Sequence, residues 1–348
     1  AKSGIAPCRG VTSCFTMAHL QDSFGRIKRD LRISVTDKCN LRCTYCMPAE
    51  GLPWLPGPEL LTVQEILTVA EVCVAHGIEK IRLTGGEPLL RRELLEIISG
   101  LAKLSPRPEI SLTSNGLGLE KMAASLRDAG LNRINISLDT LDQERFLKLT
   151  HRDRLADVFS GIKAAEEAGF TPIKINAVLM RGINEDEAPK LLAWALERGY
   201  QMRFIEQMPL DPQHGWNRNE MLTADEIIAK LELNHVLTPL DDRGSSPAEL
   251  FLVDGGPATV GIIGSVTRPF CADCDRIRLT SDGQIRNCLF ATSEADVRGI
   301  LRSGLPAHVI EQQVAEVLFA EVRMKKKGHG IGDPEFEQPK RPMSAIGG

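Results

Sequence analysis

From residue 31 onward, short runs rich in β-forming residues alternate with longer stretches whose apolar residues recur every three or four positions. Strands are predicted at 31–36, 80–84, 109–113, 133–138, 172–179 and 201–206. Helices are predicted near 62–76, 91–104, 119–129, 155–168 and 187–199. Several of these helices end at a glycine in the C-terminal cap position, namely Gly77, Gly130, Gly169 and Gly199. Six strand–helix repeats predict an α/β fold built on a parallel sheet with right-handed crossovers.

The predicted strands carry polar residues along one face. Both faces of an open parallel sheet lie under helices, and such strands are apolar throughout. Here alternate positions are polar, at Arg32, Ser34, Thr36, Lys80, Arg82, Thr84, Arg133, Asn135, Ser137, Lys174, Asn176 and Arg203. Because helices would cover the apolar face, we expect the polar face to line the interior of a barrel.

Cations recur among these inward positions, and burying several of them unpaired would cost much free energy. We therefore expect the barrel to bind a strongly anionic ligand. An alternative is that the cations pair with acids such as Asp139 or Glu206, or lie at exposed strand ends. That alternative suffices for a single cation, whereas several cations on matching faces favour the ligand.

Two segments of the chain interrupt this pattern. Residues 1–24 contain no acid before Asp22 and show no periodicity, so a flexible N-terminal tail is predicted; a mitochondrial transit remnant is a less favoured interpretation. Residues 241–249 are polar and turn-rich. They predict a boundary between a barrel region, 25–245, and a smaller C-terminal region, 246–348.

Composition limits the classes of function. The 348 residues carry 42 Lys and Arg against 46 Asp and Glu, a net charge of −4, which gives no general reason to bind nucleic acid or anionic lipid. No apolar run approaches the roughly 18 residues that a membrane span requires. A cytoplasmic protein with neither a membrane segment nor a nucleic-acid partner is therefore expected.

Six of the nine cysteines fall into two tight groups. Cys39, Cys43 and Cys46 form a CxxxCxxC pattern directly after the first predicted strand, and hence at its C-terminal end. Three thiolates can hold three irons of a cubane 4Fe–4S cluster and leave the fourth iron open to a small ligand. A structural zinc site is the alternative, but such sites usually have four protein ligands and no further His or Cys lies nearby.

After the second predicted strand, Thr84-Gly85-Gly86-Glu87-Pro88 places two glycines where the backbone can approach a ligand closely. A plain strand-to-helix turn explains this motif equally well by itself. Combined with CxxxCxxC on the preceding strand, however, it resembles the radical S-adenosylmethionine (SAM) superfamily. In that superfamily the open iron binds the amino and carboxylate groups of SAM, and an electron from the cluster cleaves SAM to a 5′-deoxyadenosyl radical.

The second group, Cys271, Cys274 and Cys288, again offers three thiolates, although a zinc site with a distant fourth ligand is a serious alternative. Arg276 and Arg278 stand two positions apart on a strand-like run and so share one face. Paired guanidinium groups of this kind suit the capture of phosphate oxygens.

With these motifs the sequence resembles one family of that superfamily, the GTP 3′,8-cyclases of molybdenum cofactor biosynthesis. The resemblance covers about residues 22–348. It is carried by the two cysteine groups, the glycine motif and the segments 24–48, 80–88, 135–139, 174–179, 203–209 and 347–348. It implies an incomplete six-stranded (βα) TIM-like barrel, a C-terminal region with a second 4Fe–4S cluster, and a homodimer.

The resemblance also assigns roles to single residues. SAM would contact Tyr45, Gly86, Glu87, Ser137 and Met208. GTP would be surrounded by Arg32, Lys80, Arg82, Thr113, Lys174, Arg203, Arg276 and Arg278. Arg32 and the C-terminal Gly347 and Gly348 would take part in catalysis, the two glycines by reaching into the active-site region.

In the family, the 5′-deoxyadenosyl radical removes hydrogen from ribose C3′ of GTP, and the carbon radical then attacks guanine C8. A further electron and proton give (8S)-3′,8-cyclo-7,8-dihydroguanosine 5′-triphosphate, which cyclic pyranopterin synthase rearranges. The sequence does not identify the reductant protein. Two alternatives stay open: another radical SAM enzyme with an auxiliary cluster, such as one that modifies a peptide, and a zinc-stabilised binding protein.

Overall fold

One twelve-stranded sheet runs through the part of the chain that the computed structural model describes, residues 18–241 and 243–347. Its centre is a run of six parallel strands, each paired with the next in sequence. These are β1 (Asp30–Ser34), β2 (Lys80–Thr84), β3 (Glu109–Ser114), β4 (Arg133–Ser137), β5 (Lys174–Leu179) and β6 (Gln201–Glu206). The six predicted strands are confirmed, and their ends lie within two residues of the expected positions.

The sheet continues beyond both edges of this six-stranded run. Beyond β6 lie β9 (Thr259–Ile263), β8 (Glu249–Val253) and β7 (Leu237–Pro239), and beyond β1 lie β10 (Arg276–Leu279), β11 (Gln284–Arg286) and β12 (Ala295–Asp296). Strands β9 and β10 are parallel to their neighbours β6 and β1, respectively. The outer strands pair with their neighbours in antiparallel fashion. In the described chain the two outermost strands do not pair with each other, so the barrel is open, as expected.

The turn-rich segment 241–249 lies between β7 and β8, which pair with each other as a hairpin. The chain therefore stays in the sheet as it passes the predicted boundary. The division into 25–245 and 246–348 stays a prediction.

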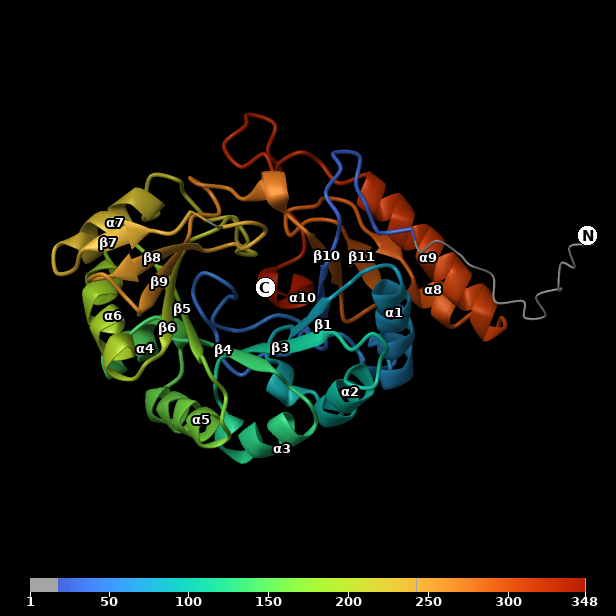
Figure 1. The fold of residues 1–348 in the computed structure, drawn as a ribbon, viewed down its shortest axis with the longest axis horizontal. Coiled ribbons are helices and arrows are strands. Elements are labelled where there is room, and N and C mark those ends of the chain that lie inside the picture. The colour runs from blue at the N-terminus through green and yellow to red at the C-terminus, as the bar shows by residue number, and fades with distance from the viewer. Residues whose placement is uncertain (1–17, 242, 348) are drawn as a thin grey trace, which may run out of the picture.

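Helices surround the barrel strands on the outside (Figure 1). The predicted helices are present as α1 (Val63–Ala75), α2 (Leu94–Leu101), α3 (Ala123–Asp128), α5 (Leu155–Glu167) and α6 (Ala188–Glu197). The others are α4 (Gln143–Thr150), α7 (Ala224–Glu232), α8 (Arg298–Leu301), α9 (Ala307–Arg323) and α10 (Met343–Ile346), with 3-10 turns at Gly57–Glu59, Pro88–Leu90, Leu119–Lys121, Glu185–Glu187 and Cys271–Asp273. All four predicted glycine caps are confirmed, since each has a φ between +69° and +110°, which glycine adopts without strain.

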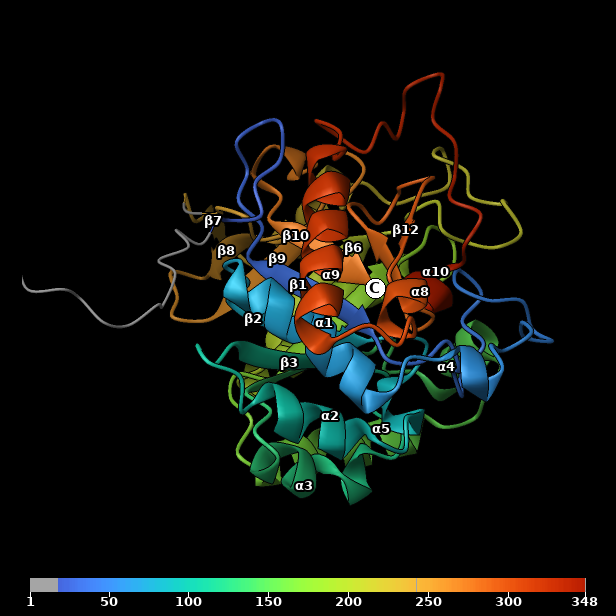
Figure 2. The same cartoon turned by 90° about the vertical axis from the view of Figure 1, so that its right-hand side faces the viewer.

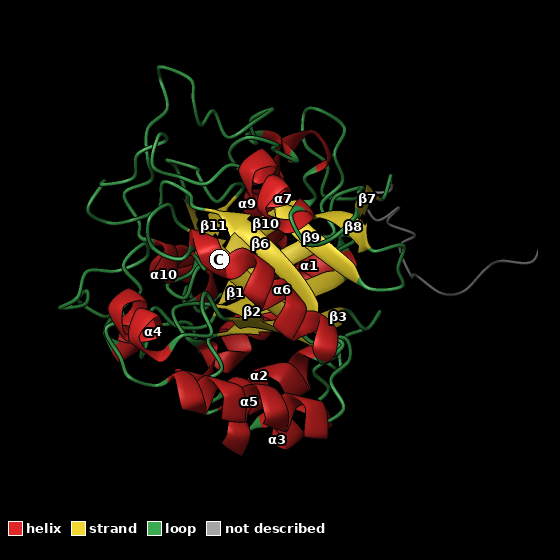
Figure 3. Ribbon diagram, turned by 90° about the vertical axis from the view of Figure 1, so that its left-hand side faces the viewer, coloured by secondary structure: helices red, strands yellow, loops and turns green. Residues whose placement is uncertain are grey.

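The alternation along the strands separates the core from the barrel interior. Leu31, Ile33, Ile81 and Leu83 are fully buried in the main hydrophobic core. Figure 3 shows the helices on the outer side of the curved sheet. The polar positions between these apolar ones therefore point to the inner side of the barrel.

Residues 18–24 are folded against the barrel, which corrects the predicted tail for this part of the chain. Leu20 is fully buried, and Asp22 pairs with the buried Lys28. The reason is tertiary, because Ser23 donates to a carbonyl of the C-terminal region, as do Arg26 and Lys28 directly after the segment. Residues 1–17 lie outside the described part of the chain.

The C-terminal segment ends inside the barrel. Helix α10 lies in the middle of the ring of helices in Figure 1, and its Ile346 is buried. Helix α9 packs beside α1 on the outside, as Figure 2 shows. Within residues 18–241 and 243–347, none of the helices combines the length and the apolar character of a membrane span.

Candidate active site

The first cysteine group sits on the loop that leaves the C-terminal end of β1. Cys39, Cys43 and Cys46 are partly buried there. The backbone N–H groups of Arg42 and Thr44 donate to carbonyls at the end of α4, at 2.9 and 3.0 Å. Helix α4, which was not predicted, therefore fixes the position of the cysteine loop.

The glycine motif holds the same loop from the β2 side. The N–H of Gly86 donates to the Thr36 carbonyl at 2.8 Å. A Cβ at Gly85 would lie 2.3 Å from the Thr36 oxygen, and one at Gly86 would lie 2.3 Å from the Lys38 oxygen. The predicted close approach of backbone is therefore present, and it is made toward the cysteine loop itself.

The surroundings of the first cysteine group disfavour thiolates that are not bound to a metal. Burial raises the pKa of Cys39 and that of Cys46, the latter to about 12, and burial together with Asp139 raises the pKa of Cys43 well above its usual range. Thiolate ligands in such a site need strong positive charge on the metal they bind. Within the described chain, no three His, Cys, Asp or Glu side chains converge as one metal ion would require.

Glu87 supports the cysteine loop from the protein interior. Its carboxylate accepts hydrogen bonds from Leu89 N, Ser114 Oγ and Asn115 N, at 3.0, 2.8 and 2.7 Å. Asn115 in turn donates to the side chain of Asn40 within the loop, at 2.7 Å. Burial raises the pKa of Glu87 to about 7. The carboxylate thus orients the loop, and the contact of Glu87 with SAM stays a prediction.

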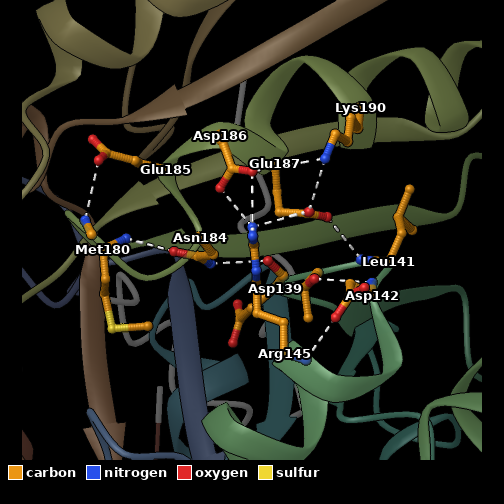
Figure 4. A network of polar contacts seen from close by, with 12 residues as sticks. Asp139, Leu141, Asp142, Arg145, Met180, Asn184, Glu185, Asp186, Glu187 and Lys190 are labelled. Atoms are coloured by element: carbon orange, nitrogen blue, oxygen red, sulfur yellow. Dashed lines mark hydrogen bonds and ion pairs between the residues drawn. The ribbon is translucent and has the colours of Figure 1, made fainter.

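Tyr45 is fixed by Asp139, which follows β4. The Tyr45 hydroxyl donates to Asp139 Oδ2 and Val178 N donates to Asp139 Oδ1, both at 2.8 Å. The Asp139 carbonyl accepts a hydrogen bond from Asn184, whose side-chain oxygen accepts one from Met180 N (Figure 4). Burial raises the pKa of Asp139 to about 6. The ends of β4 and β5 are thereby locked around Tyr45.

The same network continues outward to the helices. Glu187 accepts a hydrogen bond from Leu141 N at 3.1 Å and pairs with Arg145 at 3.0 Å and Lys190 at 3.5 Å (Figure 4). The loop after β4 is therefore tied to α4 and α6. This part of the barrel rim is built as a rigid support.

The predicted inward cations lie on the inner side of the sheet. The strand register places Arg278, Arg32 and Arg82 side by side across β10, β1 and β2. Arg32, Arg203, Arg276 and Arg278 are each at most 8% exposed. Within the described chain, the buried Nε atoms of Arg32, Arg82, Arg203 and Arg276 have no hydrogen-bond partner. These arginines, together with Lys174, form what we call the cation row.

The acids suggested as partners for these cations are engaged elsewhere. Asp139 receives the hydrogen bonds described above, and Glu206 accepts two backbone N–H groups at 2.7 Å. Asp30 does reach the row, at 3.7 Å from Arg276 Nε. Neutralisation by Asp139 or Glu206 is therefore excluded, but Arg133 pairs with Glu109, as the alternative expected. The row, which does not include Arg133, keeps an excess of positive charge.

Burial, together with mutual repulsion within the row, lowers pKa values in the cation row. Burial, followed by Arg276 and Arg82, holds the pKa of Arg32 well below its usual range. Burial and Arg203 lower the pKa of Lys174 to about 7. A polyanion bound against the row would relieve both the repulsion and the cost of burial.

Two residues that were predicted to surround GTP, Lys80 and Thr113, do not belong to the cation row. Lys80 is exposed at the start of β2, so the structure does not bring it to the buried cations. Its place at the N-terminal end of the strand is the reason. Thr113 lies on β3, where its hydroxyl accepts a hydrogen bond from Asn135 at 3.3 Å.

The second cysteine group lies at the opposite end of the barrel from the first. Cys271 and Cys274 precede β10, whereas the first group follows β1, and the two strands are parallel. Cys288 follows β11, which runs back antiparallel to β10. All three cysteines line a cavity of about 670 Å³. The cation row therefore lies between the two groups.

Positive charge surrounds the second group. Burial acts to raise the pKa of the Cys274 thiol, but Lys325, Arg276 and Lys28 outweigh it, so that this pKa is lowered. Burial raises the pKa of Cys271. A lowered pKa favours the thiolate form that iron ligands require, so the donor set fits a second cluster.

The C-terminal tail meets both the cation row and the first cysteine group. The Gly347 carbonyl accepts a hydrogen bond from Arg278. A Cβ at Gly347 would lie 2.7 Å from Thr84 Cγ2, and the φ of +80° also favours glycine. The backbone of Ser344 hydrogen-bonds the Cys46 thiol. The tail is thus seated in the site, as the sequence predicted for Gly347.

The other predicted SAM residues lie near this tail or on the barrel wall. Met208 packs against the apolar cluster that includes Ile346 of α10. Ser137 is partly buried at the end of β4, opposite Asn176 of β5. Gly348 lies outside the described residues, so its predicted role stays a prediction.

Sequence reasoning missed two contributors to the site. Asp30 stands two residues before Arg32 and therefore shares its strand face. A predicted strand longer by one residue would have included Asp30. Ser344 carried no such signal, because tertiary folding alone brings it to Cys46.

Two family models match the chain: "Radical SAM superfamily" over residues 33–195 and "Molybdenum Cofactor Synthesis C" over residues 200–331. A GTP 3′,8-cyclase from Streptomyces coelicolor is 56% identical over 332 residues, which cover 94% of this chain and 96% of that protein. A GTP 3′,8-cyclase from Mycobacterium sp. (strain KMS) is 53% identical over 335 residues, which cover 96% of this chain and 95% of that protein.

Among solved structures, Streptococcus suis SuiB bound to precursor peptide SuiA is similar with a TM-score of 0.61. The match covers 86% of this chain and 68% of that chain at 14% identity, so it concerns the fold alone. The relatives that match over nearly the whole length share far more of the sequence. The chain therefore belongs to the GTP 3′,8-cyclase family of the radical SAM superfamily.

Proposed function

We propose that this protein converts GTP to 3′,8-cyclo-7,8-dihydro-GTP with SAM as the radical source, the first step of molybdenum cofactor biosynthesis. The observation that carries the proposal is the cation row between two groups of three cysteines: among the described residues, four of its buried arginine Nε atoms have no hydrogen-bond partner. A nucleoside triphosphate supplies the negative charge that this row lacks. The relatives named GTP 3′,8-cyclase support guanine as the base.

The cation row would hold the triphosphate. Arg32, Arg82, Arg276 and Arg278 come from three adjacent strands, so their guanidinium groups can grip several phosphate oxygens at once. Their position is set by strands rather than by mobile loops, which fixes the ribose relative to SAM. The guanine base is expected toward the second cysteine group.

The first cysteine group would hold the cluster at the other end of the site. When bound, this cluster supplies the electron that cleaves SAM to methionine and the 5′-deoxyadenosyl radical, which takes hydrogen from C3′. Tyr45 is held by Asp139 beside the group, and the Gly85–Gly86 turn fixes the loop. The chain thus positions SAM and keeps water away from the reacting carbons.

The tail would close the site between the two ligands. Gly347 contacts Arg278 of the row, and Ser344 contacts Cys46 of the first group. Few side chains could follow this path, because a Cβ at Gly347 would lie 3.1 Å from Ser34 Cβ as well as close to Thr84. The tail is therefore expected to align Arg278 while shielding the reaction from solvent.

Product analysis tests the proposal directly. Anaerobically reconstituted protein is incubated with GTP, SAM and dithionite, and the nucleotide product is identified by mass spectrometry. GTP deuterated at C3′ should deliver its label to 5′-deoxyadenosine, whereas label at other ribose carbons should stay in the nucleotide. Transfer from another carbon would refute the mechanism.

Several assignments stay predictions. Cyclic pyranopterin synthase is expected to consume the product, and the protein is expected to form a homodimer in the cytoplasm. The reductant protein is unidentified. The likeness to SuiB is one of fold, so it gives no support to the alternative of a peptide substrate.

A further inference from the structure

Cationic side chains from outside the cysteine motif hold the main chain of the second group. Lys28 Nζ donates to the Cys274 carbonyl at 2.8 Å. Arg26 Nη1 donates to the Cys271 carbonyl at 2.5 Å. Both cations come from the segment just before β1, which is far from the second group in sequence. The main chain at Cys271 and Cys274 is therefore held by side chains from the N-terminal part of the protein.

Lys325, just after α9, secures the third ligand segment. Its Nζ donates to the carbonyl of Asn287, the residue before the third cysteine, and to the Arg276 carbonyl at 3.1 Å. Lys28 is fully buried and Lys325 is 5% exposed. We call Arg26, Lys28 and Lys325 the cation clamp.

Asp22 organises two members of the clamp. Its carboxylate accepts Arg26 Nε at 2.6 Å and Lys28 Nζ at 2.8 Å. It also accepts the backbone N–H groups of Phe24 and Arg26 at 2.9 and 3.0 Å. The three cations of the clamp outnumber this carboxylate, so the clamp keeps a net positive charge beside the cysteines.

We propose that the cation clamp positions the ligands of the second cluster and raises its reduction potential. This inference rests on the proposed function, which places a 4Fe–4S cluster on Cys271, Cys274 and Cys288. A cluster gains negative charge when it is reduced, so nearby positive charge stabilises the reduced state. Buried charges act strongly because neither water nor salt screens them well. The clamp members are positioning residues, since they act through the backbone that carries the ligands.

A redox titration can separate charge from mere structural support. The second cluster is observed by itself in a background in which Cys39, Cys43 and Cys46 are changed to Ala, with electron paramagnetic resonance as the readout. In this background Lys28→Gln keeps a hydrogen-bond donor but removes the charge, and should shift the midpoint potential to more negative values. Asp22→Asn removes the negative charge and should shift it to less negative values. Lys163→Gln, on the exposed face of α5, is the matched control and should leave it unchanged.

The outcomes are decisive in both directions. Opposite shifts for Lys28→Gln and Asp22→Asn, with no shift in the control, support the inference. Shifts of the same sign in both variants, or no shift in Lys28→Gln and Lys325→Gln, would overturn it. If Lys28→Gln does not fold by circular dichroism, Lys325→Gln takes its place with the same expected sign. A background protein with no cluster signal at all would refute the second cluster itself, which is a failure of the proposed function.

Discussion

The two cysteine groups each offer three thiols, in different electrostatic surroundings. Near the first group lie the acids Asp139 and Glu87, and burial raises the pKa of all three thiols. Close to the second group lie Lys28, Arg276 and Lys325, and the pKa of Cys274 is lowered despite burial, whereas burial raises the pKa of Cys271. Because reduction adds negative charge to a cluster, we expect the first cluster to have the lower potential. Such a difference would let three thiolates hold a strong reductant in the first group and a milder cluster in the second.

The strongest test of this comparison is to remove a cysteine ligand from each group in turn. Cys39→Ala should abolish reductive cleavage of SAM, because the first cluster cannot assemble. Cys288→Ala should leave the first cluster assembled but stop cyclisation of GTP. Formation of 5′-deoxyadenosine and of the cyclic product, measured side by side, checks both expectations. A Cys288→Ala protein that cyclises GTP at the normal rate would show that the second assignment is wrong.

The tail contacts both the cation row and the first cysteine group, so its removal should uncouple these two parts of the site. Deleting Gly347 and Gly348 should leave both clusters and the fold intact yet remove most of the cyclisation, because Arg278 loses its contact with the tail. Iron content and circular dichroism are the controls, and product formation is the readout. A peptide with the tail sequence should restore part of the activity. Wild-type turnover by the truncated protein would instead favour a frayed tail without a role.

The cation row should matter for GTP and not for SAM. Arg276→Ala, Arg278→Ala or Lys174→Ala removes a charge-assisted contact worth about 1.5–3 kcal/mol, so GTP binding should weaken by roughly ten- to a hundredfold. Lys80→Ala is the matched control and should change GTP binding little, because Lys80 is exposed. Calorimetric titration with GTP and with SAM measures both affinities. Unchanged GTP affinity in all three row variants would contradict the assignment.

A smaller effect should appear in the pH dependence of GTP binding. Burial and neighbouring cations lower the pKa of Lys174 from 10.5 to about 7, so the free protein loses this proton as the pH rises above that value. A bound polyanion restores the proton, and GTP affinity should therefore fall as the pH rises through this range. Titration in buffers of different ionisation enthalpy should show proton uptake, which Lys174→Met should abolish.

Lys174 should also make the free energy of unfolding depend on pH, with a sign opposite to that of its effect on GTP affinity. Between pH 7 and 10.5 the unfolded chain binds the Lys174 proton and the folded chain does not, so the contribution of Lys174 to the free energy of unfolding should rise with pH. Lys174→Met should flatten this rise in chemical denaturation experiments without ligand. An equal slope in both proteins would contradict the lowered pKa.

Local patterns explain what could be predicted from the sequence. The alternation of Arg32 with Leu31 and Ile33 is a period-two signal carried by neighbouring residues, so both the strand and its inward cation were predictable. The seating of residues 18–24 was not, because Asp22 and Lys28 act on the second cysteine group, which lies about two hundred and fifty residues further along the chain. The pairing of β10 with β1 is equally non-local, and that of β9 with β6 also joins strands that are not consecutive in sequence.

Strands β9 and β10 lie late in the sequence, and this has a consequence for the synthesis of the protein. The stretch from β9 to β10, Thr259–Ile263 and Arg276–Leu279, covers both open edges of the six-stranded run. A nascent chain that has reached only residue 245 would carry β6 and β1 with unpaired backbone groups, a state prone to pair with other chains. Both edges of the six-stranded run are therefore covered only after the chain has been synthesised as far as β10.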